Sequence, residues 1–133
     1  MLREIKKFVE ILEQVRKEHY DTAFGLQPFP EHLREHIEVK FGKKYAKLVC
    51  VNKSGNVASA WGFIALEDGS INGHKHCAGD LLKPASFSRP TAISRGSICV
   101  TIGEKKGAPA SFNVYGPDYV KSLKENLKEN LKE

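Results

Sequence analysis

Residues 45–66, YAKLVCVNKSGNVASAWGFIAL, decide the fold of this chain. Tyr45–Asn52 and Val57–Leu66 are rich in the β-branched and aromatic side chains that favour strands. The four residues between them, KSGN at 53–56, have the composition of a tight turn. Two strand-forming stretches joined by a short turn predict an antiparallel hairpin.

The first 42 residues are expected to form a helical segment of two helices, with a connection at 21–30 that contains Gly25, Pro28 and Pro30. Residues 2–19 carry apolar side chains at spacings of three and four, which place them on one face of an amphipathic helix: Ile5, Phe8, Val9, Leu12 and Val15. A second, short helix is expected from Pro30 to about Val39, because Leu33 and Ile37 are one turn apart. Gly42 is suited to follow its end.

Beyond the hairpin, the pattern predicts further short strands separated by polar connections. The expected elements are a polar loop at 70–78, a third strand at 79–83, and two further strands at 97–102 and 110–115. The stretch 84–94 is expected to be irregular, because Pro84 and Pro90 exclude a central strand.

A helix is expected to begin at Pro117 and to continue toward the C-terminus. Its apolar stripe consists of Val120, Leu123, Leu127 and Leu131. These patterns together predict an α+β fold, in which an antiparallel β-sheet is flanked by N-terminal and C-terminal helices.

The length of 133 residues suits one domain with a modest core. We expect a single domain over residues 1–133, in which the helical segment 1–42 packs on a sheet and C-terminal helix formed by 43–133. Hydrophobic residues make up 41% and charged residues 28% of the chain, which is a globular and not a disordered composition.

The expected location is the cytoplasm. Cys50, Cys77 and Cys99 contain no C-x-x-C pair and are odd in number, which favours a reducing compartment. No apolar run approaches the roughly eighteen residues that cross a membrane, so no membrane partner is expected. The N-terminus is charged from Arg3 onward and lacks the apolar run of a signal peptide.

Positive charge is concentrated in one segment. The formal net charge is +5, which is mild for a nucleic-acid-binding domain and does not favour such a partner. Residues 83–106 contain five basic side chains (Lys83, Arg89, Arg95, Lys105 and Lys106) against Glu104 alone. A local excess of this kind indicates a small anionic partner; the alternative is a solvated basic surface with no specific ligand.

No motif for catalysis or metal binding is complete. His74, His76 and Cys77 offer zinc-type ligands, but a structural zinc site requires four and a catalytic one requires three plus water. Phosphate-loop and nucleophile-elbow patterns are missing from the sequence. We therefore expect no catalytic residue, no metal site and no cofactor.

The stretch GDLLKPASFSRPTAISRGS, residues 79–97, combines the groups that bind a nucleotide. Phe87 offers a ring face on which a base can stack. Lys83, Arg89 and Arg95 offer cations for phosphate, and the hydroxyls can bond ribose. The alternative interpretation places Phe87 in the core and the arginines on an ordinary surface.

This stretch resembles the signature of a family of small phage proteins, the Thoeris anti-defence sponges of the first type. The similarity covers Gly79 to Ile98, with weaker matches at Tyr115–Lys121, at Tyr45–Lys47 and at Phe63. The resemblance implies an antiparallel sheet with helices and a homo-oligomer, either a dimer or an assembly of dimers. It also implies capture of cyclic ADP-ribose isomers made by host enzymes with TIR domains, and in some members of cyclic oligonucleotides. The ligand is released intact.

The same resemblance assigns roles to individual residues. Phe87 would stack on the adenine, and Arg95 and Gly96 match the Arg-Gly step of the signature. Ser97 stands where the family usually has Asn, and Lys121 stands where it has Arg. The complete set of expected ligand-binding residues is Lys83, Phe87, Arg89, Arg95, Gly96, Ser97, Tyr115 and Lys121.

The leading hypothesis is therefore a phage-encoded protein that sequesters a cyclic nucleotide immune signal in the host cytoplasm without degrading it. Two other hypotheses stay open. The first is a small basic module that binds nucleic acid or protein and inhibits a host factor. The second is an enzyme that degrades the same signal.

Overall fold

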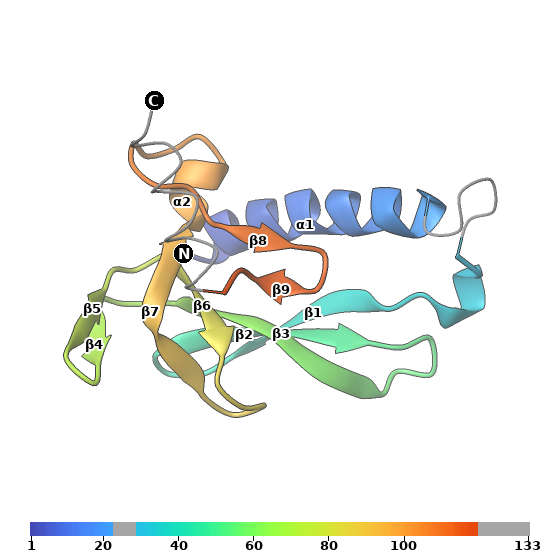
Figure 1. Ribbon diagram of the computed structural model, residues 1–133, viewed down its shortest axis with the longest axis horizontal. Helices are drawn as coiled ribbons and strands as arrows, with labels where there is room; N and C mark the ends of the chain where they lie inside the picture. The colour runs from blue at the N-terminus through green and yellow to red at the C-terminus, as the bar shows by residue number, and fades with distance from the viewer. Residues whose placement is uncertain (23–28, 120–133) are drawn as a thin grey trace.

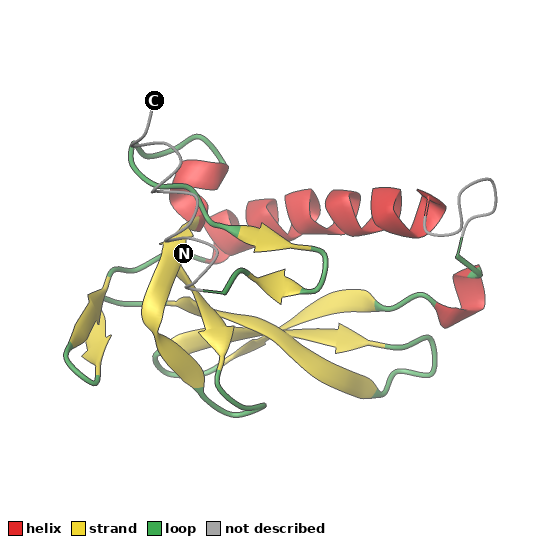
Figure 2. Cartoon of the chain, viewed as in Figure 1, coloured by secondary structure: helices red, strands yellow, loops and turns green. Residues whose placement is uncertain are grey.

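The computed structural model describes residues 1–22 and 29–119, and it confirms the α+β class. One long helix lies across an antiparallel sheet, and a short helix follows the last strand of that sheet (Figure 1 and Figure 2). The elements in chain order are α1 Leu2–Thr22, a 3-10 helix Glu31–Leu33, β1 His36–Phe41, β2 Tyr45–Val51, β3 Val57–Ala65, β4 Gly69–Ile71, β5 His74–His76, β6 Asp80–Pro84, β7 Pro90–Ser97, α2 Ile98–Thr101, β8 Phe112–Asn113 and β9 Gly116–Pro117.

The main sheet of the described residues has five strands in the order β1-β2-β3-β6-β7, and all neighbours are antiparallel. Two smaller ribbons, β4-β5 and β8-β9, accompany it. The β8-β9 ribbon lies between α1 and the sheet (Figure 1). Within residues 1–22 and 29–119, no helix combines the length and the apolar composition that crossing a membrane requires.

The core lies between α1 and one face of the sheet. Ile5, Phe8 and Leu12 of α1 are fully buried, as their spacing predicts. The Phe8 ring packs edge-on against Phe112, with 5.3 Å between centroids, and lies 6.4 Å from the Trp61 ring. Aromatic contacts therefore join the helix, the sheet and the β8-β9 ribbon into one cluster.

The predicted hairpin at 45–66 is confirmed as β2 and β3. Its turn is stabilised by Asn52, whose side-chain oxygen accepts hydrogen bonds from the backbone N–H groups of Ser54 and Asn56 at 3.0 Å. Gly55 adopts a φ of +86°, which a residue without a Cβ reaches easily. The sequence therefore identified both strands and the residues that turn the chain.

The helix predicted at residues 2–19 is confirmed as α1, but the helix predicted from Pro30 to Val39 is wrong, so the segment 1–42 is only partly helical. Only Glu31–Leu33 form a 3-10 turn, and His36–Phe41 form β1, which pairs with β2. The sequence HIEVKF alternates apolar and polar side chains, which is the period of a strand. The spacing of Leu33 and Ile37 suggested one helical turn, but the alternation of polar and apolar residues at 36–41 determines the conformation as a strand.

Two further predictions also fail for local reasons. The expected polar loop at 70–78 contains β4 and β5, joined by Asn72 and Gly73, both with positive φ. An Asn-Gly pair of this conformation is a favoured hairpin turn. The expected strand at 97–102 is helix α2, because the Ser97 hydroxyl caps it by accepting a hydrogen bond from Cys99 N–H.

The remaining predictions are borne out in part. The strand expected at 79–83 is β6, whereas the irregular stretch expected at 84–94 includes the start of β7, an edge strand on which Pro90 is tolerated. The strand expected at 110–115 is the shorter β8, and Pro117 lies in β9, not in a helix. The predicted C-terminal stripe of Val120, Leu123, Leu127 and Leu131 lies outside the described residues.

Candidate functional site

The connection between β6 and β7 presents an aromatic ring and one cation at the surface, and a lysine of β2 lies against the ring. Phe87 is 51% exposed, and Arg89 is exposed beside it in the sequence. The Arg89 carbonyl accepts hydrogen bonds from the backbone of Ala85 and Ser86 at 2.8 and 3.2 Å, which closes the loop. The ammonium of Lys47 lies 3.9 Å from the centre of the Phe87 ring, a close cation–π contact.

Lys47 was not among the expected site residues, although the alternation of side chains along β2 places it on the face of the sheet opposite α1. Ala46 and Leu48 belong to the core beneath α1, so the residue between them points to the opposite face of the sheet. We name Lys47, Phe87 and Arg89 the loop surface. The β6–β7 connection lies at the bottom of Figure 1, whereas α1 runs along the top.

Lys83 lies on the other face of the sheet from Phe87. Leu81 belongs to the core beneath α1, and Lys83 follows it by two strand positions. The Lys83 ammonium donates to the carbonyl of Pro117 at 3.1 Å and lies 4.1 Å from the centre of the Tyr119 ring. The Lys83 ammonium therefore binds the last residue of β9 and the aromatic ring two residues beyond it.

Arg95 is buried, with only 4% of its surface exposed. Its Nε donates to the Asp118 carbonyl at 2.9 Å, and one Nη donates to the Thr91 hydroxyl at 2.9 Å and to the Ile93 carbonyl. Burial lowers the pKa of the Arg95 guanidinium. Among the residues that the structure describes, no carboxylate forms an ion pair with it. Arg95 and Lys83 thus bind neighbouring backbone carbonyls, those of Asp118 and Pro117, at the end of β9.

Gly96 and Ser97 serve the packing of the segment that passes beside β7. Gly96 has a φ of +96°, and a Cβ there would lie 2.0 Å from the Pro109 carbonyl oxygen. The Ser97 backbone exchanges hydrogen bonds with Ala108 and Ala110 at 3.0 and 3.1 Å. Both residues also line a hollow of about 320 Å³ whose rim carries Lys105 and Lys106.

The last two expected site residues lie apart from the loop surface. Tyr115 occupies the turn of the β8-β9 ribbon, is 80% exposed, and places its hydroxyl 3.4 Å from Nε2 of His19 on α1. Lys121 lies outside the described residues. Of the expected residues, Phe87 and Arg89 therefore share one exposed loop, where Lys47 contacts the Phe87 ring, while Lys83 and Arg95 bind backbone within the chain.

A second cavity, which the sequence analysis missed, surrounds Arg16. It has a volume of about 420 Å³ and is lined by Arg16, His19, Tyr20, Phe29, Glu35, Cys50, Ser59, Val114 and Tyr115. Burial raises the pKa of the Cys50 thiol, so this wall carries a neutral thiol at neutral pH. The helical spacing could have predicted that Arg16 is buried, because it continues the stripe of Ile5, Phe8 and Leu12 on α1.

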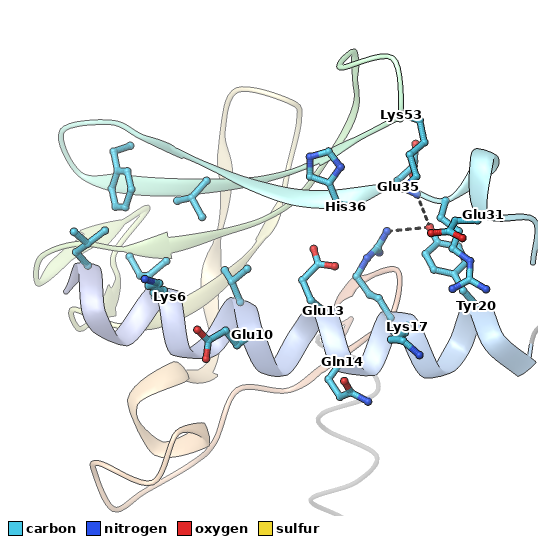
Figure 3. Close-up of a pocket in the computed structure, with 17 residues that line it drawn as sticks. Lys6, Glu10, Glu13, Gln14, Lys17, Tyr20, Glu31, Glu35, His36 and Lys53 are labelled. Atoms are coloured by element: carbon cyan, nitrogen blue, oxygen red, sulfur yellow. Dashed lines mark hydrogen bonds between the residues drawn. The ribbon is translucent and has the colours of Figure 1, made fainter.

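A groove of about 730 Å³ between α1 and β1 adjoins this cavity (Figure 3). Arg16, Tyr20 and Glu35 line both spaces. Glu13 of α1 accepts a hydrogen bond at 2.5 Å from Ile37 N–H on β1. The helix therefore occupies a backbone donor on the edge of the sheet, which limits pairing with another strand there.

The histidines of the β4-β5 ribbon do not form a metal centre. His76 is buried and His74 is exposed. Within residues 1–22 and 29–119, no group of three or more His, Cys, Asp or Glu side chains is arranged to hold a metal ion.

Comparison with known proteins adds no relative. No protein-family model, no curated protein and no solved structure matches this chain.

Proposed function

We propose that this chain binds a cyclic nucleotide immune signal, either a cyclic ADP-ribose isomer or a cyclic oligonucleotide, and sequesters it without degrading it. The observation that supports this proposal is the half-exposed Phe87 ring with the Lys47 ammonium 3.9 Å from its centre. In this proposal the protein is a phage anti-defence protein that acts in the host cytoplasm.

The loop surface has the chemistry that such a ligand requires. A base stacked on an aromatic side chain contributes about 1–3 kcal/mol, whatever the identity of the base. Lys47 supplies a positive charge close to the ring. Arg89 supplies a second, exposed charge from the same loop as Phe87, and a guanidinium can bind a phosphate through two parallel hydrogen bonds. One face of one chain therefore offers a stacking group and partners for a phosphate.

A second copy of the chain completes the site in this proposal. Lys83 and Arg95 bind backbone carbonyls of their own chain, so the cations of residues 83–106 do not converge on one ligand. A ligand with two phosphates requires further cations, which the loop surface of a partner subunit would supply. We therefore propose a dimer or an assembly of dimers as the binding form.

Isothermal titration with cyclic ADP-ribose isomers and cyclic di- and trinucleotides tests the proposal. Phe87→Ala should weaken binding by about 5- to 150-fold, which corresponds to the loss of one stacked base. Phe41→Ala is the matched control, because Phe41 is also an exposed phenylalanine, at 53%, and lies on β1. Binding by no member of the panel, or equal losses in the two variants, would contradict the proposal.

Two further measurements separate this function from the alternatives. If the ligand is released by heating after incubation and recovered unchanged, the protein is not an enzyme that degrades it. A module for nucleic acid would instead bind longer strands more tightly and would lose affinity steeply with salt.

A further inference from the structure

Arg16 brings a positive charge into the cavity under α1 without a carboxylate beside it. The side chain is only 7% exposed, and among the described residues no acidic group lies within ion-pair distance of it. One Nη donates to the Val114 carbonyl at 2.7 Å and the other to the Tyr20 hydroxyl at 3.2 Å. A buried charge without an ion-pair partner is costly, so an anion that contacts the guanidinium in the cavity would be favoured.

The Arg16 guanidinium and the Tyr20 hydroxyl keep donor hydrogens that no acceptor in the described part of the chain uses. Arg16 Nε makes no hydrogen bond but has almost no accessible surface, so a ligand cannot reach it. Each Nη carries two hydrogens, and the bonds to Val114 and Tyr20 use one on each. The Tyr20 hydroxyl accepts from Arg16 and from the backbone N–H of Glu35, both at 3.2 Å, and Figure 3 draws both bonds as dashed lines. A phenol oxygen accepts two hydrogen bonds and donates one, so its proton stays available.

The rest of the wall suits a flat apolar body. Phe29 and Val114 line the cavity, and the Phe29 ring lies 5.2 Å from the Tyr20 ring at an angle of 36°. The volume of about 420 Å³ lies within the range of small-molecule sites. Ser59 and Tyr115 are exposed and mark the open side of the cavity.

The charges at this cavity favour a monoanion over a dianion. Among the described residues that line it, Arg16 is the one guanidinium, and Glu35 carries a negative charge on the same wall. His19 contacts the Tyr115 hydroxyl at the exposed side. A carboxylate therefore matches the single guanidinium better than a doubly charged phosphate does.

We propose that the Arg16 cavity is a second ligand site, independent of the loop surface, which binds a small aromatic carboxylate. The carboxylate accepts from a remaining Nη–H of Arg16 and from the Tyr20 hydroxyl, and the ring lies against Phe29 and Val114. This site does not depend on the proposed nucleotide function, because Phe87 and Arg89 are not among its residues.

Titration of the ¹⁵N-labelled full-length protein with benzoate, followed by NMR, tests the site. Benzoate should shift the amide signals of Val114 and Tyr115, whereas benzamide, which has the same shape and no charge, should not. Phenyl phosphate should bind more weakly than benzoate. Equal binding of benzamide, tighter binding of phenyl phosphate, or no shifts at millimolar benzoate would overturn the proposal.

Three variants locate the binding. Arg16→Met should weaken benzoate binding by about tenfold or more, which is the effect of one hydrogen bond to a charged group. Ser59→Phe fills the open side from an exposed position, so it should block binding even if Arg16→Met does not fold. Lys75→Met removes one positive charge from an exposed position on β5 that belongs to neither site, so this variant should bind benzoate like the unmodified protein. Unchanged binding in Ser59→Phe, or equal losses in Arg16→Met and Lys75→Met, would contradict the assignment.

Discussion

Substitution of Gly96 by alanine should destabilise this protein far more than the same change at another glycine of similar conformation. The φ of +96° strains any residue with a Cβ, at a cost of about 1–2 kcal/mol. The new Cβ would also lie 2.0 Å from the Pro109 oxygen and 2.7 Å from its carbonyl carbon. Because both atoms belong to the backbone, the segment at 108–110 must move away as a unit.

That movement breaks the two hydrogen bonds between Ser97 and the passing segment. Each contributes about 1 kcal/mol, so the total loss is about 3–4 kcal/mol. This is a large part of the roughly 5–15 kcal/mol that stabilises a domain. The same calculation for Gly55, which has a φ of +86° and no atom within 4 Å of its Cβ position, leaves only the loss of about 1–2 kcal/mol from backbone strain.

Urea unfolding followed by circular dichroism measures both losses on the same scale. We expect Gly96→Ala to lose about 2 kcal/mol more than Gly55→Ala, since only the first breaks backbone contacts. If the two variants lose the same free energy of unfolding, the packing of residues 108–110 against Gly96 is not as described. A stable Gly96→Ala variant would show that Gly96 is not required for packing, and would favour its predicted role in ligand binding.

Two other predictions concern the core and the pH dependence of stability. Phe8→Ala should lower the free energy of unfolding by about 3–5 kcal/mol, because Phe8 is fully buried between Trp61 and Phe112; a loss below about 1 kcal/mol in urea unfolding would place α1 elsewhere. Arg3 and Lys7 hold the pKa of Glu104 below its ordinary value of 4.5, so the stability from this carboxylate is present above that pH and is lost as the pH falls through the lowered pKa. Glu104→Gln should therefore destabilise the protein at about pH 7 and not at about pH 2, and an equal effect at both would refute the interaction.

Local patterns predicted the elements whose stability is local. In the hairpin at 45–66, β-branched residues indicate the two strands, and Asn52 and Gly55 indicate the turn. Helix α1 follows from the spacing of its apolar side chains. The Asn72–Gly73 pair is a favoured hairpin turn, so it also predicts the two short strands β4 and β5.

The failures concern features that depend on distant parts of the chain. Arg95 can be buried because its Nε donates a hydrogen bond to the carbonyl of Asp118, which lies 23 residues further along the chain. No local sequence pattern predicts that contact. Helix α2 forms from strand-favouring residues because the Ser97 cap and the surrounding packing outweigh propensity. The same limit applies to the expected site, in which residues from one sequence motif fall on two faces of the sheet.

The most direct test of the proposed function is an NMR titration of the ¹⁵N-labelled protein with a cyclic ADP-ribose isomer and with cyclic di- and trinucleotides. The proposal predicts that at least one ligand shifts the amide signals of Lys47, Phe87 and Arg89 as a group. If no member of the panel shifts these signals, or if a tightly bound ligand shifts only signals distant from the loop surface, the proposed function is wrong.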